Sequence, residues 1–104
     1  MIPGLLRHFL RLERLQASPD GRGGWIEDWS LLVESPGRLQ PLVGRSLELA
    51  GRLHAEARFA LYLPPDLEAR RGDRVSLGSR RFQVLVTSLG HPGRYEKLLL
   101  RELS

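Results

Sequence analysis

The chain has 104 residues, enough for one domain whose single small core leaves much of its surface exposed, so oligomerisation would help to stabilise it. It contains no cysteine, which excludes disulfide bonds, thiolate metal ligands and a cysteine nucleophile. The formal net charge is +4, and Lys97 is the only lysine among 16 basic residues. Because arginine favours bidentate contacts with phosphates and carboxylates, this bias indicates nucleic-acid or acidic-protein partners, or else only a GC-rich or thermophilic source.

The chain starts with a short apolar segment, MIPGLLRHFL, in which Arg7 and His8 follow only two leucines. This segment is much shorter than the apolar region of a signal peptide or a membrane span. We therefore expect a soluble cytoplasmic protein with no membrane partner, in which residues 1–7 form an irregular or short helical lead.

Two strand-like segments flank a glycine-rich turn between Leu10 and Val33. The first reads LRLERLQ and the second WIEDWSLLV, and the turn ASPDGRGG between them contains residues that favour chain reversal. The pattern predicts a β-hairpin whose second strand ends near Ser35-Pro36-Gly37. We assign Trp29 to the core and Trp25, next to the turn, to a partner contact.

The segment 35–53 shows no clear periodicity and is punctuated by proline and glycine. Residues 38–43 are compatible with a continuation of the strand, and Gly44 to Gly51 with a loop or one helical turn. We expect a flexible loop, because Pro36, Gly37, Gly44 and Gly51 supply few fixed contacts.

Four further segments are predicted as strands, the first three because apolar residues recur at every second position and the fourth as the segment that closes the chain. They are His54–Leu63, which stops at Pro64-Pro65, then Arg74–Leu77, Arg81–Ser88 and Tyr95–Leu103. Phe59 and Phe82 share faces with aliphatic residues, which places both in the core. Six or so strands separated by turns predict a mainly β fold: one domain over 1–104, a small antiparallel β-barrel or rolled sheet with long loops and little helix.

No motif for catalysis, a cofactor or a metal is present. The three histidines lie far apart without carboxylates at ligand spacing, and no serine lies in a nucleophile elbow. The DGRGG turn is followed by a strand, whereas a phosphate-binding loop is followed by a helix. We therefore expect no catalytic residue, no cofactor site, no metal site and no enzymatic activity.

Two arginine pairs, Arg70-Arg71 and Arg80-Arg81, bracket the short strand 74–77. They either meet phosphates or form a solvated rim that Glu68 and Asp73 partly neutralise.

Several motifs occur in a characteristic order: LRHFLRLER, DGRGG with Trp29 shortly after it, LYLPPD, RRGDRV, RRFQVLVTS and YEKLLLREL. In this order the chain, from Leu6 to Leu103, resembles the phage head–tail joining proteins, also called head-closure or stopper proteins. The resemblance implies a virion structural protein that forms a ring, dodecameric like the portal, below the portal after DNA packaging. The ring retains the genome and gives the tail its attachment surface.

By this resemblance, the partners are the portal or an adaptor protein, tail proteins and further copies of the chain. Packaged DNA is contacted in the channel without sequence specificity. The location is the neck of the virion, after assembly in the host cytoplasm. We expect the docking surface at Arg22, Trp25, Arg70, Arg71, Arg80 and Arg81. The channel-lining loop is expected within 35–53, at Pro36, Gly37, Arg38, Gly44, Arg45 and Gly51.

Two alternatives remain. One is a basic small β-barrel that binds nucleic acid through an arginine face, with an affinity that falls steeply with salt. The other is an adaptor or tail-completion protein of the same assembly, although the adaptors of this setting are mainly helical and this chain is mainly strands.

Overall fold

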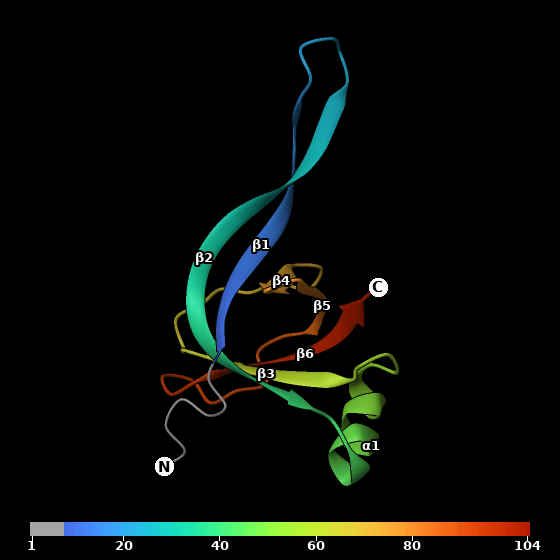
Figure 1. Cartoon of the computed structure of the whole chain (residues 1–104), viewed down its shortest axis with the longest axis vertical. Coiled ribbons are helices and arrows are strands. Elements are labelled where there is room, and N and C mark those ends of the chain that lie inside the picture. The colour runs from blue at the N-terminus through green and yellow to red at the C-terminus, as the bar shows by residue number, and fades with distance from the viewer. Residues whose placement is uncertain (1–7) are drawn as a thin grey trace.

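A computed structural model describes residues 8–104, and the lead expected over residues 1–7 lies outside the described residues. The elements are β1 (His8–Pro19), β2 (Trp25–Pro41), α1 (Gly44–Leu53), β3 (Phe59–Leu63), β4 (Arg74–Leu77), β5 (Arg80–Val86) and β6 (Glu96–Leu103). Neighbouring strands are antiparallel, and the sheet closes on itself in the order β1-β2-β3-β6-β5-β4 (Figure 1). The mainly β fold with a closed antiparallel sheet is therefore confirmed.

The core of the closed sheet is built from inward-pointing residues that recur at every second position of its strands. On β6, Leu98 and Leu100 point into the sheet, whereas Leu99 points out of it. Phe82 is fully buried inside, and Phe59 packs edge-on against it with ring centroids 5.2 Å apart. Both phenylalanines thus lie where the sequence predicts. The other buried members of this interior are Leu10, Leu12, Leu61, Leu63, Val75 and Val84.

A second apolar cluster lies outside the sheet and combines residues of α1, β3, β5 and β6. Its buried members are Leu42, Ala50, Ala57, Ala60, Leu85 and Leu99. Val86 also packs here rather than beside Phe82 and Val84, which corrects the simple alternation expected for this strand. The cause is a register shift between Val84 and Val86 against β6, because one extra residue in a strand reverses the faces of those that follow.

The segment 35–53 is regular structure, which corrects the expected loop. Pro36, Gly37 and Arg38 lie within β2, which continues to Pro41. A side chain on Gly37 would come within 2.8 Å of Leu10 and 2.9 Å of Leu63, so glycine allows β2 to cross the core closely. Pro36 lies where β2 has only β1 as a neighbour, because β3 pairs with β2 from Arg38 onward.

Gly44, Arg45 and Gly51 belong to the ten-residue helix α1. Ser46 accepts a hydrogen bond from the Val43 amide and donates one to its carbonyl, which closes the first turn. A side chain on Gly51 would meet nothing within 4 Å, so this glycine lies in an open part of the helix and does not end it. Since α1 runs to Leu53, β3 starts at Phe59 and not at His54 as expected.

The predicted hairpin is confirmed, but its outer half leaves the body of the molecule. β1 pairs with β4 only from Arg11 to Glu13, and β2 pairs with β3 only from Arg38 to Pro41. Residues 15–29, which we call the arm, therefore form a two-stranded ribbon that projects along the long axis of a 52 × 29 × 28 Å molecule (Figure 1).

The turn at the tip of the arm has the local structure that its sequence predicts. Asp20 accepts hydrogen bonds from the amides of Arg22, at 2.7 Å, and Gly24, at 3.0 Å. Gly21 and Gly23 have φ values of +81° and +83°, which glycine adopts without steric cost.

Candidate assembly surfaces

One face of the arm is largely apolar, and within residues 8–104 no second layer packs on it. Cross-strand partners share a face, so the pairs Leu15–Trp29, Ala17–Glu27 and Pro19–Trp25 lie on the same side of the ribbon. Trp25 is 71% exposed and Leu15 is 44% exposed. Glu27 is the only charged residue among these six. We call these six residues the outer face of the arm.

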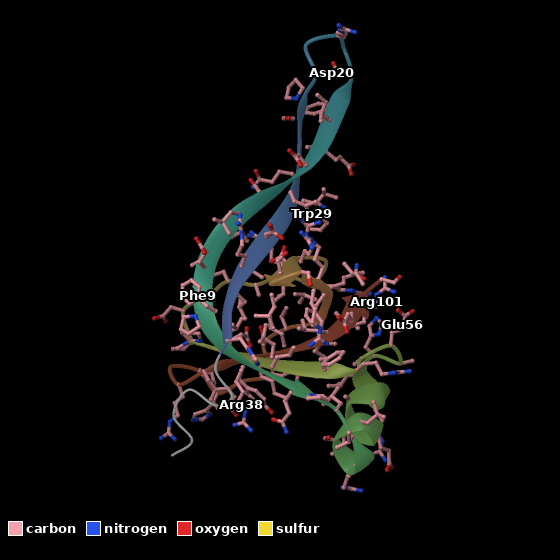
Figure 2. The ribbon with its side chains drawn as sticks, viewed as in Figure 1. Phe9, Asp20, Trp29, Arg38, Glu56 and Arg101 are labelled. Atoms are coloured by element: carbon pink, nitrogen blue, oxygen red, sulfur yellow. The ribbon has the colours of Figure 1, made fainter. Side chains whose placement is uncertain are left out.

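Trp29 does not lie in the core, contrary to expectation. It is half-buried where the arm leaves the body, in neither apolar cluster of the part that the structure describes (Figure 2). The guanidinium carbon of Arg74 lies 4.3 Å from the centre of its ring, a cation–π contact. The wrong expectation arises because alternation on a strand marks two faces without indicating which of them is covered.

Hydrogen-bonded ion pairs fix the root of the arm to the body. The guanidinium of Arg14 donates two bonds of 2.9 Å to the buried carboxylate of Asp73, and one to the carbonyl of Glu68. Hydrogen bonding to Asp73 raises the pKa of Arg14. Asp73 also accepts the amide of Arg70 at 2.8 Å, so one carboxylate joins β1 to the connector before β4.

The carboxylate of Glu13, which lies on the opposite face of β1 from Arg14, joins β1 to β4. Glu13 accepts bonds from the Ser76 hydroxyl at 2.7 Å and from Arg74 at 2.9 Å. Burial raises the pKa of Glu13, but the hydrogen bonds from Ser76 and Arg74 outweigh it, so this pKa lies below its usual value. Because Arg74 also contacts Trp29, this network orients the root of the arm.

The candidate arginines do not form one patch. Arg70 and Arg71 are exposed before β4, and Arg80 and Arg81 follow it, so the two pairs lie at opposite ends of a strand about 10 Å long. Arg22 lies in the turn at the tip of the arm, where its amide donates to Asp20.

Only part of this positive charge is free. Arg80 donates two bonds, of 2.7 and 2.9 Å, to Glu102, and its guanidinium carbon lies 5.0 Å from the Phe82 ring centre. These hydrogen bonds lower the pKa of Glu102. Asp73 is likewise occupied by Arg14. The arginines near β4 thus resemble a partly neutralised rim more than a continuous phosphate-binding face.

An apolar groove lies between α1 and β6, and sequence reasoning missed it. It has a volume of about 260 Å³ and includes Leu49 and Leu53, which remain 41% and 59% exposed. Among the described residues that line it, Lys97 is the only charged one; the others are Leu42, Ser46, Leu49, Ala50, Leu53, Leu89 and Leu99. The spacing of Leu49 and Leu53, four residues apart, is a helical signal that could have indicated its helical side.

Within residues 8–104, no group of three or more histidine, aspartate or glutamate side chains is placed to hold a metal ion. Over the same residues, no helix has both the length and the apolar character needed to cross a membrane. The prominent features of this part of the chain are thus surfaces suited to protein contacts.

Comparison with known families decides between the possible assignments. The model of the phage head completion protein family matches residues 1–103. The chain belongs to this family. This head completion protein is therefore a phage structural protein associated with the virion, and its family implies contacts with other head and tail proteins.

A search of curated proteins found no match to this head completion protein. Among solved structures, the solution structure of protein SF1141 from Shigella flexneri 2a is similar, with a TM-score of 0.74 and 17% sequence identity over 98% of this chain and 96% of that one. At this identity the likeness concerns the fold alone, and it supports the closed sheet.

Proposed function

We propose that this head completion protein forms a ring below the portal of a tailed phage, where it retains packaged DNA and provides the attachment surface for the tail. In this ring it contacts the portal or an adaptor protein on one side and tail proteins on the other. A ring of twelve copies would match the portal symmetry that the family resemblance implies.

The observation that carries this proposal is the arm. A ribbon that exposes Trp25 and Leu15 on one face, beyond the closed sheet, exposes apolar surface that a solitary small protein has no reason to keep. Tryptophan is enriched at the energetically dominant positions of protein interfaces. A rigid body with an apolar arm suits a structural protein that binds several neighbours.

In the same ring, the exposed arginines Arg70, Arg71 and Arg81 are available for contacts that depend on charge and not on base sequence. We propose that those facing the channel meet DNA phosphates. We also propose that residues 35–53 line the channel. They would do so as the end of β2 and as α1, and not as a flexible loop. A free protein that binds DNA by itself, with affinity that falls steeply with salt, would favour the nucleic-acid-binding alternative.

Complementation tests the proposed function. A phage that lacks this gene is supplied with the wild-type chain, with Trp25→Asp or with Ile26→Asp. Ile26 is the matched control, because it is the next residue, is 53% exposed and lies on the opposite face of the arm. We expect Trp25→Asp to yield heads that lose DNA and carry no tails, and Ile26→Asp to yield infectious particles.

Filled and tailed particles in the absence of the gene would refute a role in head closure. Equal losses with Trp25→Asp and Ile26→Asp would refute the role of the outer face of the arm.

A further inference from the structure

We propose that the outer face of the arm of one subunit docks in the groove between α1 and β6 of the next copy of the chain. This inference rests on the proposed ring and names the contact that joins its subunits. It assigns one occupant to the groove, a second copy.

The two surfaces have complementary chemistry. Glu27 is the only charged residue of the outer face of the arm, and among the described residues that line the groove Lys97 is the only charged one and Ser46 the only other polar one. An interface between them would bury Trp25 and Leu15 against Leu49 and Leu53, which are all exposed in the single chain. It would also give each lone charge an oppositely charged partner, which a buried charge requires.

The overall charge distribution favours the same contact. Residues 15–29 contain three acidic residues and one basic residue, a net charge of −2, whereas the whole chain carries +4, so the rest carries +6. An acidic arm is therefore attracted to the body of another copy. Arm-to-arm pairing would instead bring together two like-charged ribbons and would place Glu27 near its own copy.

The positions of the two surfaces exclude a contact within one chain. The arm projects from one end of the long axis, and α1 lies at the other end (Figure 1). A contact between two different surfaces is heterologous, and such contacts repeat into a ring when the rotation closes. Two copies that exchanged arms reciprocally would instead close as a dimer, so a ladder of oligomers is the result that distinguishes the proposed ring.

Site-directed disulfide formation tests the contact, because the chain has no cysteine of its own. Ala17→Cys lies on the outer face of the arm and Leu53→Cys lies in the groove. Ser18→Cys is the matched control, because Ser18 is exposed at the neighbouring position on the opposite face. The variants are oxidised as mixed purified chains at high concentration and in assembled phage particles.

We expect the Ala17→Cys chain to form covalent dimers with the Leu53→Cys chain, and a chain carrying both substitutions to form a ladder of oligomers. The Ser18→Cys chain should cross-link to the Leu53→Cys chain about tenfold less. Cross-links in neither preparation, dimers of Ala17→Cys with itself only, or equal yields for Ala17→Cys and Ser18→Cys would each overturn the proposal.

Charge exchange provides a second test that is independent of disulfide geometry. In the background of the cross-linking pair, Glu27→Lys and Lys97→Glu should each reduce the yield about tenfold, and both together should restore it. Equal losses in the single and double variants would contradict the pairing. Failure of the proposed function looks different: phage lacking the gene would still make filled, tailed particles, whichever residues cross-link.

Discussion

Replacement of Asp73 by alanine should destabilise the protein strongly, because this carboxylate is buried and occupied. It accepts two bonds from Arg14 and one from the Arg70 amide, and its side chain is only 3% exposed. Removal of one partner of a buried ion pair costs about 3–5 kcal/mol, because the other charge remains unpaired. The Arg14 side chain is 22% exposed, so water can solvate part of the guanidinium that Asp73 no longer pairs. We therefore expect the free energy of unfolding to fall by about 3 kcal/mol, the lower end of this range.

Thermal unfolding followed by circular dichroism measures this loss, with an expected decrease in Tm of about 12–20 °C for a domain of this size. Glu102→Ala is the matched control, because Arg80 and Glu102 form a pair with the same bidentate geometry on the surface. Exposed pairs contribute little, so the control should melt close to the wild type. Similar small shifts for both variants would refute the argument that burial of Asp73 anchors the arm.

Three further outcomes follow from the same structure. Gly37→Ala should cost about 1–3 kcal/mol in urea unfolding, because its methyl group would overlap Leu10 and Leu63; a wild-type midpoint would contradict the close crossing. The pKa of Glu13 is lower in the folded chain than the ordinary value of 4.5, so its stabilisation is complete above that pH and declines as the pH falls through the folded value. The stability difference between wild type and Glu13→Gln, measured by urea titration, should therefore shrink below about pH 4.5, and a constant difference would contradict the network. Limited trypsin digestion followed by mass spectrometry should cut first at Arg22 in the exposed turn and spare Arg38 in β2; early cleavage at Arg38 would support the flexible loop that the structure replaces.

The closed sheet could be predicted because its strands carry the period-two signal of a half-buried surface. On β3, Leu61 and Leu63 point inward and alternate with Ala60 and Tyr62. Leu98 and Leu100 on β6, and Phe82 and Val84 on β5, also point inward at every second position. The family outline could be recognised for a related reason, since its motifs fall mostly on these strands and their turns.

The predictions from sequence were wrong where glycine and proline residues favour a break but tertiary packing favours a continuous helix or strand. Gly44 and Gly51 favour a break, but the second cluster stabilises α1 through Ala50, and Gly51 lies in open space. Pro36-Gly37 favours a strand end, but Gly37 is required at a close crossing. Alternation in the arm is clear, yet it does not indicate that Trp25 stays exposed or that Trp29 lies outside both apolar clusters of residues 8–104.

Candidate contact residues were harder to predict than the fold, because contacts depend on which residues the folded chain brings together. Trp25 and Arg22 lie at an exposed tip, as a turn-flanking position suggests, and the structure adds that the outer face of the arm is continuous around Trp25. The two arginine pairs are close in sequence but are separated by the length of β4. The α1–β6 groove combines residues more than forty positions apart, so a local pattern can indicate its helical side but not the strand that completes it.

Electron cryomicroscopy of the neck of the phage that encodes this chain tests the central claim most directly. The account predicts a ring of copies of this closed sheet immediately below the portal, between the packaged DNA and the tail. A neck in which the position below the portal is filled by another protein, with no density for this fold, would contradict it.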